Sequence, residues 1–326
     1  MKKKKTDKKR FFILYYIVLV LFTAFVLLDT FLLPKSYAAV TTTTTTTTQD
    51  AASTTSTEDT TTSDTSADTS ESTASDSTGE VTLTESSYSD DNIQITITEE
   101  RANDTTYYVV DITVSDIQYL KTAFANNTYG RNIKETTSAM AEENNAILAI
   151  NGDYYGFRDT GYVIRNGVLY RDTAEEDTDA LVINSDGSMT VVNQSDVTAA
   201  TLLEEGALQV FSFGPTLVED GEIAVSSTEE VGQSMSSNPR TAIGQISENH
   251  FIIVVSDGRT SESEGLSLYE LAEIFQEKGA TIAYNLDGGG SSTLVFNGEV
   301  INTPVAGTKG SSGSERTISD IIYFGY

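Results

Sequence analysis

Cysteine and tryptophan are absent from the 326 residues of this chain, and histidine occurs only once, as His250. Without cysteine, the chain has no thiol nucleophile, no disulfide and no cysteine-based zinc site. His250 lies in a polar turn before an expected strand, so we predict an exposed turn residue rather than a catalytic base. A Ser-His-Asp triad and a zinc centre are therefore not expected, whereas a calcium or magnesium ion held by oxygen ligands remains open.

Basic residues are scarce outside the N-terminus. Residues 1–10 contain seven of the 20 lysines and arginines, whereas residues 11–326 contain 13 basic and 47 acidic residues, a net charge of −34. The phosphates of a nucleic acid require a basic surface, so we expect no nucleic-acid partner. Such an acidic body suits a soluble, secreted protein and attracts divalent cations. No segment indicates a protein partner.

The N-terminus combines a basic segment, residues 1–10, with a long apolar run, residues 11–33. At about 1.5 Å per residue, this run crosses a hydrocarbon core of about 30 Å. Positive charge before the run places the N-terminus in the cytoplasm and the later residues outside the cell. We therefore expect a single-pass signal-anchor in the cell membrane. A signal peptide cleaved after Ala38 is the alternative, which the length of the run disfavours.

Residues 40–79 have low complexity and include eight successive threonines, at positions 41–48. Their serines, threonines, acidic residues and alanines cannot bury enough apolar surface to form a core, so we predict a disordered stalk. As a flexible coil, this segment reaches about 35 Å root-mean-square. The predicted organisation is a cytoplasmic segment 1–10, a signal-anchor 11–33, the stalk 40–79 and one folded domain, 80–326.

Hydrophobic periodicity predicts an α/β domain of mixed α+β character for residues 80–326, with a mixed sheet and helices packed on it. In residues 92–98, three isoleucines alternate with polar residues, which is typical of a half-buried strand. The predicted strands are 92–98, 107–114, 146–150, 162–164, 168–170, 180–183, 188–192, 208–213, 241–246, 251–256, 282–286 and 293–296. The predicted helices are 133–144, 197–205 and 268–278.

The helix at 268–278 has the clearest signal. Ser267 and Glu270 have the spacing of a capping box, and Gly279 follows the end of the helix. With the strands on either side, this helix forms a strand–helix–strand unit over residues 251–286. Its two strands are most simply parallel, with a right-handed crossover.

A loop that is nearly free of large side chains follows the strand 282–286. The strand ends in Asp287, and the segment Gly288-Gly289-Gly290-Ser291-Ser292 comes next. Glycines allow a ligand to approach the backbone closely, and successive amides can form an anion-binding nest. The alternative is a glycine-rich hairpin turn, but two-residue turns need only one or two glycines. The pattern favours a functional loop.

Similar loops follow two other predicted strands. The strand 251–256 leads into Asp257, and the strand 146–150 leads into Asn151-Gly152-Asp153. Ligands bind beyond the carboxyl ends of parallel strands in α/β sheets, so we expect these loops to form two sides of one cleft. Taken singly, each loop is also explained by ordinary Asx-Gly turn chemistry.

Arginine is scarce in this acidic domain, so Arg240, Arg259 and Arg316 are informative. A guanidinium group binds a phosphate or a carboxylate through two parallel hydrogen bonds. The alternative for each arginine is an ion pair with a nearby acidic residue. Tyr154 and Phe157, with Tyr155 between them, provide either a sugar-stacking surface or ordinary packing.

Together, these segments resemble the phosphodiester glycosidase family, whose members include bacterial exopolysaccharide-associated proteins. The matching segments are 149–155, 213–218, 239–244, 257–259, 286–294 and 315–316. They occur in the order of the family and extend the resemblance over about residues 90–326. One departure is visible, because the family often has Asn-Gly-Gly before two aromatic residues, where this chain has Asp153. A carboxylate at that position is therefore not general in the family.

The resemblance implies hydrolysis of a sugar-1-phosphodiester on the sugar side, giving a free sugar and a phosphomonoester. The expected catalytic carboxylates are Asp287 first, then Asp153 and Asp257, each able to activate water or to stabilise an oxocarbenium ion. Which of them is acid, base or nucleophile stays open. The expected substrate-binding residues are Asn151, Arg240, Arg259, Gly288, Gly289, Gly290, Ser291 and Arg316.

The leading hypothesis is a membrane-anchored, extracellular hydrolase acting on glycopolymers of the cell envelope or on exopolysaccharide, with no cofactor. One alternative is a non-catalytic protein that binds or assembles an envelope polymer. The other is a phosphodiesterase that depends on a divalent metal ion, which the aspartate-rich loops favour. Product formation and sensitivity to a chelator distinguish the three.

Overall fold

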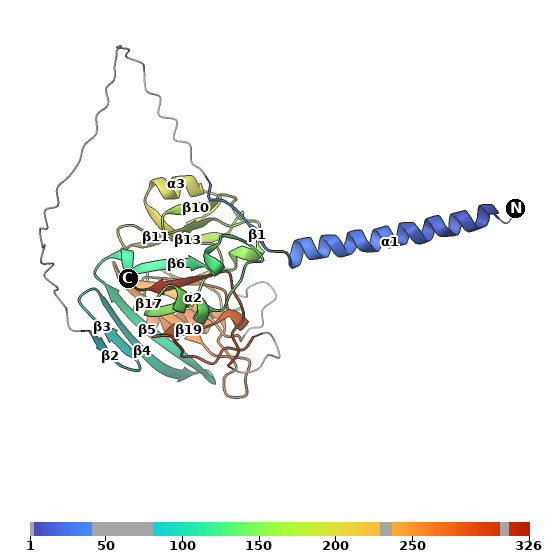
Figure 1. Ribbon diagram of the computed structural model, residues 1–326. Helices are drawn as coiled ribbons and strands as arrows, with labels where there is room; N and C mark the ends of the chain where they lie inside the picture. Colours follow the sequence, from blue (N-terminus) through green and yellow to red (C-terminus); the bar gives the residue numbers. More distant parts are fainter. Residues whose placement is uncertain (1–2, 41–80, 229–236, 307–312) are drawn as a thin grey trace, which may run out of the picture.

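The structure is a computed structural model that describes residues 3–40, 81–228, 237–306 and 313–326 (Figure 1). Helix α1 (Lys3–Phe31) projects from the body as one long helix. Its segment Phe11–Phe31 is long and apolar enough to cross a membrane, and none of it is buried within the protein. This segment covers the predicted apolar run 11–33 except for its last two residues.

Two β-sheets form the centre of the body, and every pairing between strands in its described parts is antiparallel. The larger sheet has the order β15 (Glu222–Ile223), β14 (Thr216–Glu219), β18 (Ile282–Asn285), β16 (Thr241–Ser247), β17 (His250–Ser256), β5 (Thr105–Val114), β4 (Ile93–Ala102), β3 (Ser87–Ser89) and β2 (Thr82–Leu83). The smaller sheet has the order β20 (Glu299–Val300), β19 (Leu294–Phe296), β8 (Leu148–Asn151), β21 (Asp320–Phe324) and β6 (Leu120–Phe124).

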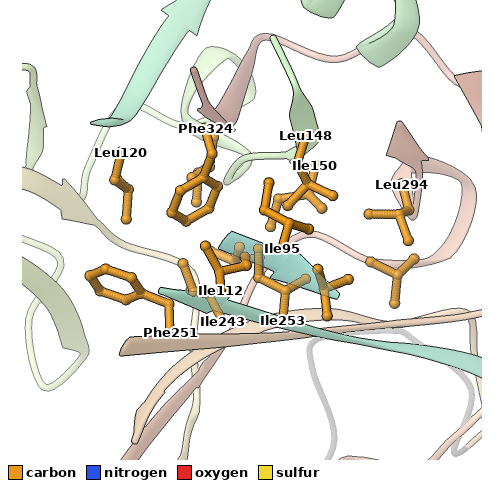
Figure 2. Packing of buried hydrophobic residues seen from close by; sticks show 14 of the residues in the cluster. Ile95, Ile112, Leu120, Leu148, Ile150, Ile243, Phe251, Ile253, Leu294 and Phe324 are labelled. Carbon is orange, nitrogen blue, oxygen red and sulfur yellow. The ribbon is translucent and has the colours of Figure 1, made fainter. Parts of the chain in front are cut away.

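The main hydrophobic core fills the space between these sheets (Figure 2). On β4, Ile93, Ile95 and Ile97 alternate with exposed residues and point into the core, as the period of a strand requires. On β8 of the opposite sheet, Leu148 and Ile150 point toward them. Each such side chain contributes about 1.5–3 kcal/mol when fully buried. This packing holds the ends of β8 and β18 in fixed positions.

Two helices cover the outer faces of the central sheets. Helix α4 (Leu268–Glu277) buries Leu271 and Phe275 against the larger sheet, and its predicted capping box at Ser267 is confirmed. Helix α2 (Thr137–Glu143) buries its apolar side against the smaller sheet. The helices therefore protect the sheet faces that the main core does not use.

A third sheet lies beside the central pair and is covered by helix α3 (Ala199–Glu204). Its strand order is β10 (Val168–Arg171), β9 (Val163–Arg165), β13 (Ala207–Phe211), β11 (Asp179–Asn184) and β12 (Met189–Asn193). The described parts of the body also contain four short 3₁₀ helices: η1 (Ile117–Tyr119), η2 (Ala125–Asn127), η3 (Tyr155–Phe157) and η4 (Gly289–Ser291).

The predicted α/β class is confirmed, but the strands form several sheets rather than one mixed sheet. The two strands of the predicted strand–helix–strand unit, β17 and β18, run in the same direction because each is antiparallel to β16. They are not neighbours, because β16 lies between them. The predicted helices 133–144 and 197–205 are shorter than expected, since α2 begins after its cap Thr136 and α3 begins after its cap Thr198.

The chain contacts the body immediately after α1, which the sequence did not predict. Strand β1 (Lys35–Ser36) pairs with β7 (Gly130–Arg131), and the amide of Val40 donates to Leu169 O, 2.8 Å away. The folded body thus includes residues 35–40 as well as the predicted domain. Apart from Val40, the predicted stalk at 40–79 lies outside the described residues.

Candidate active site

Asp287 lies two residues after Asn285, the last residue of β18, at the centre of the candidate site. Its Oδ2 accepts hydrogen bonds from the Ser291 hydroxyl at 2.6 Å and from Arg316 Nη2 at 2.7 Å. Arg316 also donates from Nε to the Ser291 hydroxyl at 2.9 Å. No residue in the described part of the chain donates to Oδ1. One carboxylate oxygen is therefore fixed, while the other is available to a ligand.

Burial raises the pKa of Asp287 above its ordinary value, although the Arg316 guanidinium and the Ser291 hydroxyl act in the opposite direction. The side chain of Asp287 is 12% exposed and that of Arg316 is 38% exposed. The pair thus lies at the boundary between the core and the solvent, where an electrostatic interaction is screened less than at an open surface.

Asn151, at the end of β8, is fully buried and contacts the backbone of the Asp287 loop. Its Nδ2 donates to Asp287 O at 2.6 Å, and its Oδ1 accepts from the Thr241 hydroxyl at 2.8 Å. Oδ1 also accepts from the amide of Thr293 at 3.3 Å. The two predicted sides of the cleft therefore meet, and Asn151 positions the loop rather than lining the cavity.

Two hollows open on either side of Asp287 and Arg316, and both residues line each hollow. The first has a volume of about 220 Å³ and the second about 200 Å³. The first hollow is lined in addition by Lys134, Asp153, Tyr154, Phe157, Ser291, Thr317, Ile318 and Ser319. The second is lined in addition by Phe213, Asn238, Arg240, Arg259, Asn285, Leu286, Gly288 and Gly289.

The first hollow has an aromatic wall. The rings of Tyr154 and Phe157 stack with their centroids 4.6 Å apart and an interplanar angle of 17°. Lys134 Nζ lies 6.0 Å from the centre of the Phe157 ring. Flat aromatic surfaces with a polar rim suit the faces of a sugar ring.

The second hollow is cationic, because Arg240, Arg259 and Arg316 all line it. Arg240 Nε donates to Leu266 O at 2.9 Å, and Arg259 Nε donates to Asn238 Oδ1 at 3.0 Å. Burial and the neighbouring Arg316 lower the pKa of Arg259, which is the effect expected where cations gather. Three guanidinium groups around one hollow suit a phosphate group.

The glycines after Asp287 are required for close packing of the backbone. A Cβ atom at Gly288 would lie 2.8 Å from Pro239 O, and one at Gly289 would lie 2.7 Å from Arg259 Nη2. Gly289 also has a φ of +60°, which disfavours other residues. Its amide donates to Pro239 O at 2.7 Å, so the predicted contribution of Gly289 to an anion-binding nest is wrong. Gly290 lies in η4 and is buried, and its carbonyl accepts from the Arg316 amide.

Asp153 lines the first hollow, but both of its carboxylate oxygens already accept hydrogen bonds. Oδ1 accepts from the Tyr155 amide at 3.0 Å, and Oδ2 accepts from the Ser212 amide at 3.1 Å. Arg165 Nη2 lies 3.0 Å from the same Oδ2 and 2.8 Å from Asp320, forming a buried triad. The contacts of Asp153 are those of a structural carboxylate.

Asp257 lies outside both hollows. Its Oδ1 accepts from the Thr303 amide at 2.7 Å and from Asn302 Nδ2 at 3.4 Å. Burial raises the pKa of Asp257, but its contacts tie the end of β17 to the segment after β20. The structure therefore brings Asp287 and Asp153 together, with Asn151 between their loops, and leaves Asp257 apart.

Several lining residues and the buried triad were not found from the sequence. Lys134 and the segment Thr317–Ser319 have no motif around them, and they reach the first hollow only through the fold. Arg165 and Asp320 lie on strands of two different sheets. The one available signal was Arg165 itself, an arginine within an apolar strand. The single histidine, His250, begins β17 and lies 3.1 Å from Asp111, so it is at the opposite end of this strand from Asp257.

Comparison with known proteins decides the family. A sequence profile described as phosphodiester glycosidase matches residues 144–325, more than half of the chain. The chain belongs to the phosphodiester glycosidase family. The matched region contains the Asp287 loop, the three arginines and, apart from Lys134, every residue that lines the two hollows of this phosphodiester glycosidase domain.

Curated relatives match parts of the chain. It is 33% identical over 205 residues to the SPbeta prophage-derived uncharacterized protein YomE of Bacillus subtilis, covering 61% of this chain and 31% of that protein. It is 38% identical over 90 residues to mouse N-acetylglucosamine-1-phosphodiester alpha-N-acetylglucosaminidase, covering 26% of this chain and 17% of that protein. The chain thus spans about a third or less of the length of the curated relatives that it matches.

Solved structures share the phosphodiester glycosidase fold. One is the catalytic domain of zebrafish N-acetylglucosamine-1-phosphodiester alpha-N-acetylglucosaminidase, auto-inhibited by its pro-peptide, with a TM-score of 0.56 and 22% identity. The match covers 71% of this chain and 82% of that chain. A hypothetical protein from Synechocystis has a TM-score of 0.54 and 16% identity, over 72% of this chain and 62% of that chain.

Proposed function

We propose that this protein is a membrane-anchored glycosidase that hydrolyses a sugar-1-phosphodiester on the sugar side, outside the cell. The observation that carries the proposal is the Asp287–Arg316 pair shared by an aromatic hollow and a cationic hollow. A substrate with a sugar at one end and a phosphodiester at the other matches these two surfaces. Membership of the phosphodiester glycosidase family supports the same reaction.

In this arrangement the sugar occupies the first hollow and the phosphate occupies the second, so the anomeric carbon lies beside Asp287. Water adds to the anomeric carbon, the bond from that carbon to the phosphate oxygen breaks, and the phosphomonoester leaves with the electron pair. A phosphate is a good leaving group and needs little protonation. Arg240, Arg259 and Arg316 stabilise the negative charge that develops on it.

Asp287 is the carboxylate that lines both hollows and keeps one oxygen without a donor in the described chain. It therefore either activates the attacking water or attacks the anomeric carbon itself. Arg316 and Ser291 orient it by holding its other oxygen. The configuration of the released sugar, followed by NMR at the anomeric proton, distinguishes inversion from retention.

The natural substrate class that we propose is a cell-envelope or exopolysaccharide glycopolymer, with α1 as the anchor. The apolar segment Phe11–Phe31 has the length for one membrane crossing, and the basic residues before it favour a cytoplasmic N-terminus. A polymer on the outer surface is then within reach of the body. Extraction with alkaline carbonate and protease accessibility in intact cells test the anchoring and its orientation.

The reaction is tested with the full chain in detergent, a sugar-1-phosphodiester substrate and water enriched in ¹⁸O. Cleavage on the sugar side puts the label in the sugar, whereas a phosphodiesterase puts it in the phosphate. Label in the phosphate together with inhibition by a chelator would support the metal-dependent alternative and overturn the proposal. Saturable polymer binding with no product from any phosphodiester would support the non-catalytic alternative.

Arg316→Gln is expected to lower kcat/KM by about 10²–10³-fold, the size of effect seen when one preorganised donor is removed. It is also expected to move the acid limb of the pH–rate profile to higher pH. The reason is that Arg316 lowers the pKa of Asp287, whereas burial raises it. Loss of the Arg316 charge therefore raises the pKa of Asp287. Arg316→Lys, which keeps the charge, should retain more of the acid-side activity. An unchanged acid limb in the glutamine variant would contradict the pairing.

Tyr154→Ala is expected to raise KM by about 3–10-fold, because it removes one ring of the stacked pair in the first hollow. The effect on kcat should be smaller, since Tyr154 does not contact Asp287 or Arg316 through any hydrogen bond in the described chain. Tyr154→Phe is the matched control and should retain the KM of the parent. Steady-state kinetics on one substrate measure both constants.

A further inference from the structure

The end of α1 is fixed against the body by one polar side chain. Asn132 donates from Nδ2 to Thr30 O at 3.1 Å and to Leu33 O at 3.2 Å. These carbonyls belong to the end of the apolar run. The residue before Asn132 is Arg131, in strand β7. The surface around Arg131 therefore lies where the apolar helix leaves the proposed membrane.

A third cavity, of about 200 Å³, opens at this place. Its walls include Arg131, Arg158 and Arg171, together with Tyr37 and Tyr170. It belongs to neither hollow of the candidate active site. Three of the few arginines in the acidic body thus lie beside the C-terminal end of α1. Tyrosines, which are enriched at membrane–water interfaces, lie with them.

The cavity has an excess of positive charge. Arg131 pairs with Asp159 at 2.5 Å and Arg158 pairs with Glu175 at 3.3 Å. Arg171 instead donates to three backbone carbonyls, those of Gly161, Tyr155 and Arg158, and it has no carboxylate partner in the described chain. Burial lowers the pKa of Arg171, and the nearby Arg165 and Arg158 act in the same direction, whereas Tyr129 and Asp153 act in the opposite direction.

We propose that this cavity binds the phosphate of an anionic lipid headgroup in the membrane that α1 crosses. The inference rests on the membrane anchoring given under the proposed function. The lipid is chosen over a soluble phosphate because Asn132 holds the cavity beside the end of the apolar helix. A body with a strong negative charge is repelled by anionic headgroups, and a local cationic cavity overcomes that repulsion at one point.

The cavity and the first hollow of the active site lie on two sides of the same short helix. In η3, Tyr155 and Gly156 line the cavity, whereas Phe157 lines the first hollow. A headgroup held in the cavity would therefore keep the active site close to the bilayer surface. This position suits substrates whose sugar phosphodiester lies near the membrane.

The test uses the full chain in micelles of a neutral detergent, with phosphatidylglycerol or phosphatidylcholine added, and native mass spectrometry to count bound lipid. The parent is expected to retain phosphatidylglycerol at least fivefold better than phosphatidylcholine. Arg131→Gln is expected to lose most of this preference and Arg131→Lys to keep it. Arg101→Gln is the matched control, because Arg101 lies on β4 and contacts Thr106 and Glu262 rather than the cavity.

Equal retention of the two lipids by the parent would overturn the proposal, as would full retention of phosphatidylglycerol by a folded Arg131→Gln protein. Displacement of phosphatidylglycerol by an equal concentration of free glycerol phosphate would assign the cavity to a soluble anion and also overturn it. Hydrolysis of a sugar-1-phosphodiester in lipid-free detergent and carbonate extraction from membranes report separately on the proposed function. Failure of the lipid preference is therefore distinguishable from failure of the enzyme or the anchor.

Discussion

Asp287→Asn is expected to lower kcat by about 10²–10⁴-fold on a sugar-1-phosphodiester, with a much smaller change in KM. Asparagine has nearly the same shape and keeps an oxygen that accepts from Ser291 and Arg316. It has no carboxylate oxygen to activate water or to attack the anomeric carbon. The variant should therefore bind substrate and fail in the chemical step. Steady-state kinetics and isothermal titration with uncleaved substrate measure the two effects separately.

Asp257→Asn is the matched control for this variant. Asp257 also follows a buried strand and is also buried, but it contacts Thr303 and Asn302 outside the two hollows. Its replacement should change kcat by less than about threefold, because it does not reach the reacting atoms in this structure. Equal losses in the two variants would indicate a general structural effect. Full activity of Asp287→Asn would end the assignment of Asp287 as the catalytic carboxylate.

Arg165→Met is expected to destabilise the protein by about 3–5 kcal/mol, because it leaves two buried carboxylates without their cation. Arg165 lies between Asp153 and Asp320, with side-chain exposures of 1%, 1% and 0% for the three residues. It also packs 4.1 Å from the ring of Phe211. Methionine fills the volume but supplies no charge and no donor. Chemical denaturation of the body, followed by circular dichroism, measures the change.

Asp320→Asn provides the control and a pH test. Burial raises the pKa of Asp320, and its Oδ1 has no hydrogen-bond partner among the described residues, which disfavours a charge there. At a pH between the ordinary pKa and the raised pKa, the folded state therefore keeps a proton on Asp320 that the unfolded state has lost. The stability contributed by this proton is complete below the unfolded pKa and is lost as the pH rises through the folded pKa. The asparagine variant should lack this part of the pH dependence and should lose much less stability than Arg165→Met.

The loop after β18 could be found from the sequence because its signal is local. An apolar strand, one aspartate and three glycines occur together, and the structure places that aspartate between the two hollows. The glycine requirement follows from the backbone of Pro239 at Gly288, and from the Arg259 guanidinium and a positive φ at Gly289; both partners lie far away in the chain. The loop predicted from the sequence lines both hollows, but the amide of Gly289 donates to Pro239 O instead of facing a bound anion.

Asp257 and Asp287 both follow a buried strand and precede a glycine, and this shared pattern does not separate them. Their difference arises from the partners that tertiary structure brings to them: Ser291 and Arg316 in one case, Thr303 in the other. The strand β16 between β17 and β18 is a further example, because its position depends on sheet order rather than on periodicity. The buried triad required two sheets to be placed side by side before it was visible.

The contacts of residues 35–40 with the body have a consequence for evolution of the threonine-rich segment. Val40 is bound to Leu169 on one side of that segment, and β2 already pairs with β3 on the other. Replication slippage that adds or removes threonines therefore changes the length of a segment whose two flanks, Val40 and β2, are both held by the same folded body. Asn132 and β1 fix the body relative to the end of α1, so in the proposed anchoring such length variation leaves the distance from the candidate site to the lipid surface unchanged.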